Sequence, residues 1–558
     1  MPSKPAPRAR PASKQPPAAP AKLPPRWLRP LILVLGAVFL IALLSRPFMD
    51  SDAWWQLKTG QYIVQNHQLP VPDPFSFTTA RSRTAYPGEE QIRRFNLTHE
   101  WLAQAALYLA WAAGGFGGVV LLRVILLSAF CILIGLTARA RGAGFYGFVF
   151  AALAAAVIVR VNAVDRPQLF TYAFVALTLY VLECRRWLWL LPPVFLFWAN
   201  AHGGFVMGWI LLAAYGAEAL VQRWRGKPAP KDRRLWLVAA ICAAVTVLNP
   251  NGWRVFQVLA AYRQSALQAT LYEWQRTNYW ELSPFTVVFY AAILTLLWAR
   301  GKARLVDWLL FPLFAAAALS AVRNIFLVAL VAPVIIASYF PWKRTLPVAA
   351  EFAVALLLAA AAIAHPFNPT PFQFRADESE FPKGAADFLV AHHITGPMFN
   401  TYVQGGYLIW RLWPQERVFT DGRALSETAF QDSNRIAGNA DSTGGRSGDE
   451  LLADYGIQVI VMNGFEFHGG KAYYLPAALS DPSQKEWKLV FQDDAAMVFM
   501  RHPPPDVQPL NSLDALVSME NECAAHIRST PQENGCAAEL GRLFSIIGDP
   551  VRARKWAR

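Results

Sequence analysis

An apolar run, WLRPLILVLGAVFLIALL, occupies residues 27–44, and the polar stretch DSDAWW follows it at residues 50–55. The run approaches the roughly 20 residues that a helix needs to cross the apolar core of a bilayer. The polar stretch opens a long segment that extends to His99-Glu100-Trp101, shortly before the second apolar run. Carboxylates, aromatic side chains and a histidine therefore lie just outside a membrane helix, where a water-facing site can meet a lipid-borne substrate.

The composition assigns the whole chain to the same class. Hydrophobic residues make up 54% of the 558 residues, charged residues make up 16%, and the mean hydropathy is +0.25. A soluble domain has about a quarter of its residues charged. The sequence therefore predicts an α-helical polytopic membrane protein. Further apolar runs, several of them shorter than a full span, are Val119–Leu136, Phe145–Val159, Leu169–Leu182 and Phe205–Val221.

The formal net charge of +14 is distributed in a way that argues against nucleic acid as a partner. Many Lys and Arg residues lie in the N-terminal tail and in short links between apolar runs. If these links are cytoplasmic, the positive-inside rule orients every span consistently. We expect about eleven crossings, with the N-terminus inside and everything beyond about His365 outside. The links are Arg139/Arg141, Arg185/Arg186, Arg223–Arg234, Arg300–Arg304 and Lys343/Arg344.

The chain divides into four parts. Residues 1–26, rich in Pro, Ala, Lys and Arg, predict a disordered cytoplasmic tail. Residues 27–365 form the expected membrane domain. We expect its first apolar run to stay in the protein as a membrane anchor and not to be cleaved as a signal peptide. Its first external loop, residues 46–100, is too long for a simple connection. Residues 366–505 predict an external α/β domain, and residues 506–558 predict a helical tail that resembles one tetratricopeptide-type hairpin.

The sequence pattern also predicts individual helices and strands in the region of the first external loop and in the α/β domain. We expect interfacial helices at Trp54–Ile63 and Glu100–Trp111 in the membrane domain, the second ending at Gly114-Gly115. Gly405-Gly406-Tyr407 is assigned to the pattern of a buried sheet. The sequence leaves open whether Cys523 and Cys536 form a disulfide. The expected strands of the α/β domain are Val418-Phe419, Gln458–Met462, Lys488–Phe491 and Ala496–Met500.

Several short motifs follow one another along residues 28–500. They are Asp52-Ala53-Trp54-Trp55-Gln56-Leu57 with Gly60, Pro70-Val71-Pro72-Asp73-Pro74-Phe75-Ser76, His99-Glu100-Trp101-Leu102, Arg166-Pro167-Gln168-Leu169, Asn200-Ala201-His202-Gly203, Leu248-Asn249-Pro250, Arg323-Asn324, Gly405-Gly406-Tyr407-Leu408-Ile409-Trp410 and Val418-Phe419-Thr420-Asp421-Gly422-Arg423. With the acidic residues after the first span and the external C-terminal domain, they resemble a bacterial set within the GT-C superfamily. The resemblance implies an integral-membrane glycosyltransferase of the bacterial inner membrane. Such an enzyme takes a sugar from a polyprenyl-phosphate carrier to a glycan, lipid or protein acceptor at the outer face.

The resemblance also implies a role for each candidate residue. A carboxylate of the first loop, Asp52, Asp50 or Glu100, would remove the acceptor's proton during attack on the sugar. Alternatively Asp52 and Glu100 would hold a divalent ion, Mg²⁺ or Mn²⁺, that neutralises the phosphate. Arg166 and Arg323 would neutralise the phosphate directly. The other expected substrate-binding residues are His202, Asn324, Trp54, Trp55 and His99.

Each candidate also has a structural interpretation. The two aspartates can cap a helix, and the two tryptophans can anchor it at the membrane interface. His99 with Glu100 can form a charge-stabilised pair. His202 lies beside two glycines, which favours a structural role but allows close approach of a substrate. Asp73 between prolines suits a turn as well as a ligand site, and Asp421 with Arg423 suits a local salt bridge.

Two other classes of function compete with the transferase. A transporter or flippase of lipid-linked saccharides would also use intramembrane arginines and broken helices. Against it, the sequence shows no internal repeat of spans, and the candidate ionisable groups lie at one face of the membrane. A non-catalytic membrane assembly protein is the third hypothesis, because the external domain can bind a partner without a functional site in the bundle.

Overall fold

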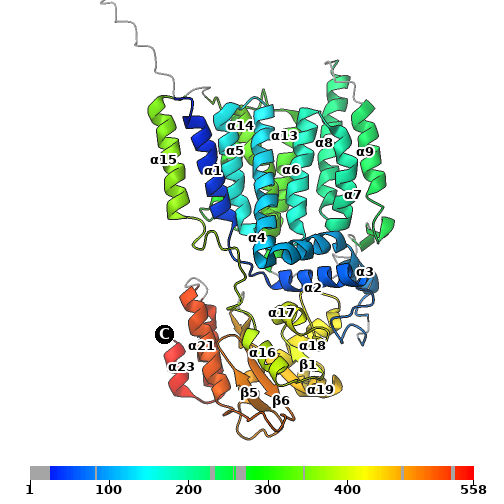
Figure 1. Cartoon of the computed structure of the whole chain (residues 1–558), viewed down its shortest axis with the longest axis vertical. Helices are drawn as coiled ribbons and strands as arrows, with labels where there is room; N and C mark the ends of the chain where they lie inside the picture. The colour runs from blue at the N-terminus through cyan, green and yellow to red at the C-terminus, as the bar shows by residue number, and fades with distance from the viewer. Residues whose placement is uncertain are drawn as a thin grey trace, which may run out of the picture.

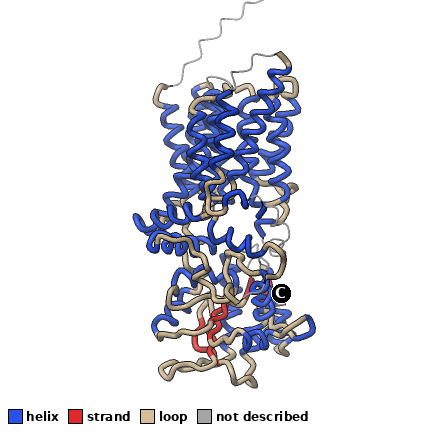
Figure 2. The backbone as a smooth tube through the Cα atoms, turned by 90° about the vertical axis from the view of Figure 1, so that its right-hand side faces the viewer, coloured by secondary structure: helices blue, strands red, loops and turns tan. Residues whose placement is uncertain are grey.

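The computed structural model describes residues 25–81, 84–226, 233–255, 257–258, 272–342, 346–466, 470–529 and 534–557. A helical bundle forms one end of the molecule and a mixed α/β domain forms the other (Figures 1 and 2). We refer to the end of the bundle next to the C-terminal domain as the domain end, and to the opposite end as the far end. Most of the expected N-terminal tail, residues 1–24, and the link Lys343/Arg344 lie outside the described residues.

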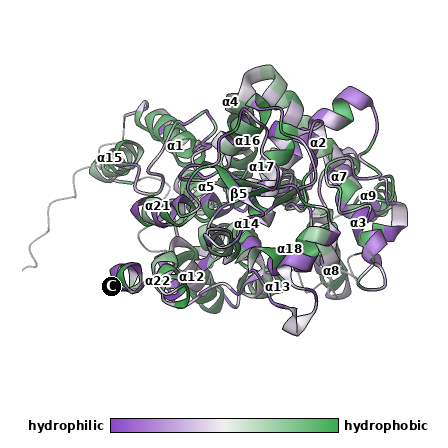
Figure 3. Cartoon of the chain, turned by 90° about the horizontal axis from the view of Figure 1, so that it is seen from below, coloured by the Kyte–Doolittle hydropathy of each residue, from purple (hydrophilic) through white to green (hydrophobic). Residues whose placement is uncertain are grey.

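The bundle consists of apolar helices that share one hydrophobic core. Their residues are mostly hydrophobic, in contrast to helix α3 below the bundle, which carries many hydrophilic residues (Figure 3). Helix α14 is buried along nearly its whole length and lies at the centre. The helices are α1 (Leu28–Leu44), the second half of α4 (Trp101–Ala140), α5 (Gly144–Val159), α6 (Gln168–Cys184), α7 (Leu191–Ala201), α8 (Phe205–Trp224), α9 (Arg233–Val245), α12 (Pro284–Trp298), α13 (Leu305–Ser320), α14 (Ile325–Tyr339) and α15 (Val348–Ala364).

Fewer helices reach membrane length than the sequence predicts. Among the described residues, four helical segments are long and apolar enough to cross a membrane: Glu89–Ala140, Gly144–Asn162, Phe205–Trp224 and Val322–Tyr339. Six other apolar helices have only 10 to 17 residues. The expectation of about eleven crossings is therefore wrong. Turns shorten the apolar runs; Arg185, for example, ends α6 in a left-handed backbone conformation that a helix cannot continue.

Three helices cover the domain end of the bundle (Figure 1). They are α2 (Ser51–Asn66), α3 (Glu89–Thr98) and the first half of α4. Helix α4 bends at Gly114-Gly115, where Gly115 has a φ of +59°, a conformation that glycine adopts without steric cost. Helix α2 contains the helix predicted at Trp54–Ile63, and the first half of α4 corresponds to the one predicted at Glu100–Trp111, whereas α3 was not predicted.

A buried ionic network joins helix ends at the far end of the bundle. Arg141 pairs with Asp307 at 2.6 Å and with Glu183 at 3.0 Å. Arg304 pairs with Glu183 and Glu218. The pattern of basic links predicts only an orienting role for these arginines. Their ion pairs with buried carboxylates show that they also connect α4, α6, α8 and α13. Ionisable groups therefore gather at both ends of the bundle.

The C-terminal domain contains a four-stranded mixed sheet in the order β1-β2-β6-β5. Strands β1 and β2 are parallel, and β6 is antiparallel to both of its neighbours. Alternate residues of β2 belong to different clusters: Val459 and Val461 join the core that continues into the bundle, while Ile460 and Met462 face the C-terminal helices. The strands are β1 (Met398–Asn400), β2 (Val459–Met462), β5 (Lys488–Gln492) and β6 (Met497–Met500).

Two expectations for this domain are corrected. Val418 is not in a strand but forms an isolated bridge with Ser76. Gly405 and Gly406 lie in helix α17 (Tyr402–Leu412) and not in the sheet. The glycines are needed because a Cβ on Gly405 would overlap a backbone carbonyl of the 418–423 segment, and one on Gly406 would overlap a carbonyl of α2. Helix α17 therefore packs directly against α2.

The helical C-terminal segment is part of the same domain. Its helices share a hydrophobic cluster with one face of the sheet, and Cys523 and Cys536 are joined by a disulfide. The expected tail thus covers the sheet. The remaining elements are α16 (Lys383–Ala391), α18 (Glu427–Ala437), α19 (Gly448–Asp454), β3 (Phe465–Glu466), β4 (Lys471–Ala472), α20 (Leu475–Leu479), α21 (Asp514–Ser529), α22 (Gly535–Ile546) and α23 (Pro550–Trp556).

Candidate active site

A cavity of about 180 Å³ lies where the bundle, helices α2 to α4 and the C-terminal domain meet. Most of the candidate residues that lie far apart in the sequence line this one cavity. They are Asp52, Trp55, His99, Glu100, Arg166, His202 and Arg323. Further lining residues that sequence reasoning did not select are Gln56, Asn96, Glu273, Trp274, Gly422 and Glu427.

The two aspartates at the start of α2 have different environments. Asp50 is the N-cap: its Oδ1 accepts hydrogen bonds from the backbone of Asp52 and Ala53. Arg166 also donates to both carboxylate oxygens of Asp50, at 2.8 and 2.9 Å. The capping interpretation therefore holds for Asp50, and its hydrogen-bonding capacity is largely used.

Asp52 faces the cavity and is less constrained. Its Oδ1 accepts a hydrogen bond from the indole of Trp55 at 3.1 Å, and its Oδ2 lies 2.9 Å from Nη1 of Arg166. Burial raises the pKa of Asp52 to about 6, although Arg166 opposes this effect. A carboxyl group with that pKa is mostly ionised at neutral pH and can still accept a proton efficiently.

The arginine side of the cavity contains a residue that sequence reasoning missed. Glu273 bridges both guanidinium groups, with 3.3 Å from Oε2 to Nη1 of Arg166 and 3.0 Å from Oε1 to Nη1 of Arg323. Trp274 holds Arg323 from the side, since the guanidinium carbon lies 4.5 Å from the ring centroid. No motif marks Glu273, which is one of two glutamates in the polar segment 249–283.

The opposite wall of the cavity holds Glu100 between two histidines. His99 donates from Nδ1 to the carbonyl of Phe95 at 2.8 Å, and its Nε2 lies 3.3 Å from Oε1 of Glu100. Both ring nitrogens of His99 thus face an oxygen atom. This arrangement agrees with the charge-stabilised pair expected for these residues.

His202 lies on the other side of Glu100 and has a neutral ring. Its Nδ1 accepts the backbone N–H of Gly204 at 3.0 Å and contacts the hydroxyl of Thr171 at 2.8 Å. The proton of the neutral ring is therefore on Nε2, which points toward Glu100 at 3.7 Å. Burial lowers the pKa of His202 to about 4, so the ring stays neutral at physiological pH.

The C-terminal domain supplies the remaining wall through the segment 421–427. Gly422 lies against Asp52 and Trp55 so closely that a Cβ at this position would overlap Oδ1 of Asp52. Two side chains of α3 hold the segment: Arg93 donates to the carbonyl of Leu425 at 2.8 Å, and Asn96 donates to the carbonyl of Arg423 at 3.1 Å.

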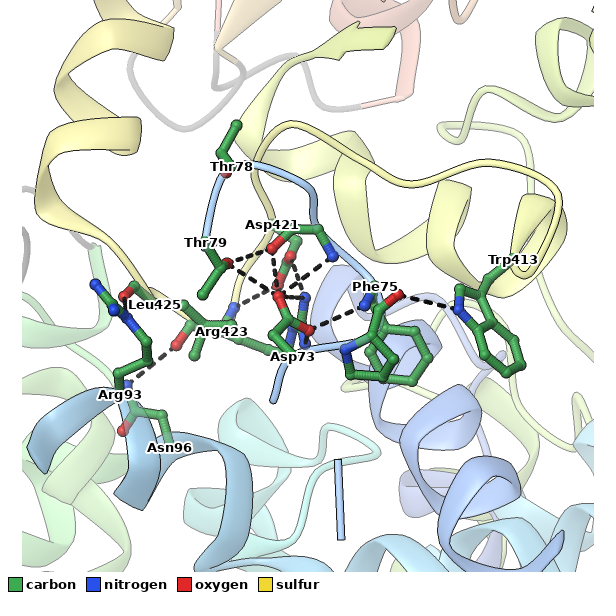
Figure 4. Close-up of polar contacts among 12 residues, drawn as sticks. Asp73, Phe75, Thr78, Thr79, Arg93, Asn96, Trp413, Asp421, Arg423 and Leu425 are labelled. Carbon is green, nitrogen blue, oxygen red and sulfur yellow. Dashed lines mark hydrogen bonds and ion pairs between the residues drawn. The ribbon is translucent and has the colours of Figure 1, made fainter. Parts of the chain in front are cut away.

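A buried ionic triad fixes the same segment to the first long loop (Figure 4). Arg423 pairs with Asp421 at 2.7 Å and with Asp73 at 2.6 Å. Asp73 also accepts backbone hydrogen bonds from Phe75 and Ser76. Burial alone would raise the pKa of Asp73, but Arg423 and these hydrogen bonds lower it. Asp73 therefore lies in a turn, and Asp421 and Arg423 form a local salt bridge, as the structural interpretations predict. The pair between Asp73 and Arg423 joins these two features, and with them the first long loop and the segment 421–427.

Three of the expected site residues do not line the cavity. Trp54 is fully buried and packs edge-on against Phe48 and Tyr407, at the centre of the contact between bundle and domain. It is therefore neither a sugar platform nor an interfacial anchor. Asn324 donates to the carbonyl of Ala317 within the turn. Asp50, the third, contacts two lining residues, the guanidinium of Arg166 and the backbone of Asp52.

The donor set does not fit a divalent metal ion. Among the residues that the structure describes, no group of three or more His, Cys, Asp or Glu side chains is arranged to hold one. Asp52 faces the guanidinium of Arg166, and Glu100 faces His99. A guanidinium group and a histidine ring thus occupy the positions next to the two proposed metal ligands.

Comparison with known proteins adds nothing to this description of the cavity. No protein-family model matches the chain, and no curated protein sequence matches it.

Proposed function

We propose that this protein is an integral-membrane glycosyltransferase of the GT-C type. It transfers a sugar from a polyprenyl-phosphate carrier to an acceptor, which is a glycan, a lipid or a protein. The single observation that carries the proposal is the cavity at the end of an apolar bundle, in which a carboxylate with a pKa of about 6, Asp52, lies beside Arg166 and Arg323. A base and a phosphate-binding pair are the two elements that this reaction requires.

Asp52 acts as the general base. The acceptor's O–H or N–H proton moves to the Asp52 carboxylate as the acceptor atom forms a bond to the anomeric carbon. The bond between that carbon and the phosphate oxygen breaks, and its electron pair remains on the phosphate. Arg166 and Arg323 stabilise the charge that develops there. Polyprenyl phosphate is the leaving group, and no oxidant or reductant is involved.

Glu100 has a different role in this proposal. Its carboxylate is held by the ring of His99 and by Gln56, which donates from Nε2 at 3.0 Å. A carboxylate with these partners is a weak base and a good fixed hydrogen-bond acceptor. We assign Glu100 and His202 to binding hydroxyl groups of the sugar or the acceptor.

Several features favour the outer face of the bacterial inner membrane. The cavity opens beside helices that cover the end of the bundle, where a lipid headgroup and a water-soluble acceptor can meet. The C-terminal domain contains a disulfide, which persists in an oxidising compartment. The cavity is smaller than the roughly 300–1,000 Å³ of a typical ligand pocket, which suits one sugar ring with its phosphate.

A direct assay separates this proposal from its rivals. Purified protein is reconstituted in vesicles with a panel of polyprenyl-phosphate sugars bearing a radiolabelled sugar, together with envelope extract as the acceptor source. We expect label in a new acceptor product that depends on the protein. Movement of the intact labelled lipid between leaflets without a product would instead establish a flippase. If neither transfer nor movement occurs with any donor, the transferase is overturned and the assembly protein is the remaining hypothesis.

A further inference from the structure

The glutamate that bridges the two arginines is the observation that carries furthest. Arg166 and Arg323 come from different loops, yet their Nη1 atoms converge on the two oxygens of one carboxylate, that of Glu273. Two guanidinium groups that converge in this way form a binding site for any compact oxyanion, including a phosphate. Among the described residues, Glu273 is the carboxylate that pairs with the Arg323 side chain.

Glu273 is also the acidic partner that is easiest to displace. Its side chain is 33% exposed, compared with 22% for Asp52 and 11% for Asp50, which bind the same Arg166. Partly exposed ion pairs are weak because water competes for both partners. Asp50 is held in addition as the cap of α2. An incoming anion would therefore replace Glu273 before either aspartate.

The charges explain why replacement is required. Asp50, Asp52 and Glu273 face two arginines, which leaves this cluster with one net negative charge. A phosphate that entered while Glu273 stayed in place would add like charge to a site that is already negative. A phosphodiester that replaced Glu273 would leave the net charge unchanged. Trp274 would keep Arg323 in position during the exchange.

We propose that Glu273 is a built-in competitor that occupies the phosphate subsite and is displaced by the singly charged phosphodiester of the lipid-linked donor. This inference rests on the proposed function, because it takes the donor phosphate to bind Arg166 and Arg323. It adds a selectivity: the site accepts a sugar linked through one phosphate and disfavours the higher charge of a diphosphate carrier. It also makes Glu273 a determinant of donor affinity that does not touch the reacting atoms.

The test measures binding to the full-length protein in detergent by titration calorimetry. The probe is farnesyl methyl phosphate, a short prenyl phosphodiester without a sugar. Glu273→Gln and Glu273→Ala should each bind it about five- to tenfold more tightly than the unaltered protein, because two weak competing ion pairs are removed. Glu281→Gln removes the same charge eight positions further along the chain, where the carboxylate accepts from Asn278, and should leave the affinity unchanged.

Further arms separate this inference from the proposed function. Arg323→Gln should lose at least about tenfold in affinity, whether or not Glu273 is also changed, and farnesol should bind all variants alike. If Arg323→Gln weakens binding while the Glu273 variants match the unaltered protein or bind more weakly, the competitor role is overturned and the phosphate site stands. If no variant changes the affinity, the proposed donor site is wrong. If the Glu273 variants gained as much affinity for inorganic phosphate as for the prenyl probe, the assignment to a lipid-borne phosphate would be overturned.

Discussion

At the scale of single residues, the cavity separates three carboxylates that look alike in the sequence. Asp50 caps a helix and binds Arg166 through both oxygens, so its charge is structural. Glu100 is held by His99 and Gln56. Asp52 keeps one face toward the cavity, and burial raises its pKa to about 6. Asp52 is therefore the carboxylate whose removal should affect the proposed chemistry most directly.

Replacing Asp52 by Asn tests this assignment. The amide keeps the size of the side chain but cannot accept the proton, so the transfer rate should fall by about 10²- to 10⁴-fold. Binding of the donor should change much less, because Arg166 and Arg323 remain. Transfer rate and donor affinity are measured on the same preparation, and its thermal unfolding in detergent is compared with that of the unaltered protein. Near-normal turnover would move the base to Glu100 or Asp50.

The pH dependence of transfer provides a second test at this scale. Asp52 accepts a proton only when it is ionised, and its pKa is about 6. The rate should therefore be constant above about pH 7 and fall about tenfold per pH unit well below pH 6. Initial rates are measured from pH 4.5 to 8, with a phosphodiester donor that does not titrate in this range. A rate that stays level down to pH 4.5 would exclude Asp52 as the base.

At the scale of elements, the segment 421–427 links the C-terminal domain to the cavity. It is held by Asp73 from the first long loop and by Arg93 and Asn96 from α3. Gly422 brings the segment against Asp52. The proposed site is therefore complete only when the domain is docked on α2 and α3. Within this segment, a change at Gly422 should lower the transfer rate, and a change at Arg423 should weaken docking.

Gly422→Ala tests the close approach. The added methyl group would overlap Oδ1 of Asp52, so either the segment or the carboxylate must shift. A displacement of about 1 Å at a reacting group costs about 10²-fold in rate. The transfer rate is compared with that of Gly301→Ala, where nothing lies within 4 Å of the added Cβ and the rate should not change. Equal activity in both variants would show that the segment does not constrain Asp52.

Arg423→Ala tests the triad. The change leaves Asp73 and Asp421 buried without their cation, which should destabilise the protein by about 3–5 kcal/mol. Arg446→Ala is the matched control, because the Arg446 side chain is more than half exposed and its pairs with Asp454 and Asp432 should together contribute about 1 kcal/mol or less. Unfolding is followed by denaturant titration in detergent. Similar losses for the two variants would mean that the triad does not hold the domain in place.

At the scale of the whole molecule, apolar helices, a layer of crossing helices and a mixed domain form a continuous structure (Figure 1). One hydrophobic cluster extends from the bundle through α2 to one face of the sheet. The cavity lies at this junction, and the ionic network of Arg141 and Arg304 lies at the far end. The two ends should therefore face different compartments if the bundle crosses a membrane.

Cysteine labelling tests this arrangement. Ser483→Cys in the C-terminal domain and Gly301→Cys at the far end both introduce an exposed thiol, in a background with Cys131, Cys184 and Cys242 replaced by Ala. A membrane-impermeant maleimide should label position 483 in spheroplasts and position 301 only after lysis. Labelling of both positions before lysis would contradict the proposed orientation, and the disulfide between Cys523 and Cys536 serves as an unreactive internal control.

The sequence by itself determined the class of the protein and the local features of the site. The apolar runs predicted a helical bundle. The two aspartates were candidate caps for the helix that became α2, and Asp50 is the cap. Gly114-Gly115 was expected to end a helix and instead marks the bend of α4. Hydrophobic periodicity and helix caps depend on neighbours within a few residues, so such features can be read from the chain. The length of the helices could not be read in this way, because turns inside the bundle depend on packing.

Only the tertiary structure decided which charges meet. Glu273 lies 107 positions from Arg166, and Asp73 lies 350 positions from Arg423. Neither pair has a local signal, because an ion pair of this kind depends on the docking of whole elements. The same holds for Gly405 and Gly406, which the sequence assigned to a sheet and which instead let α17 approach α2. Docking thus places polar residues from distant parts of the chain around one cavity. These charges are stable there because a charge inside an apolar structure is stable only where the fold brings it a partner.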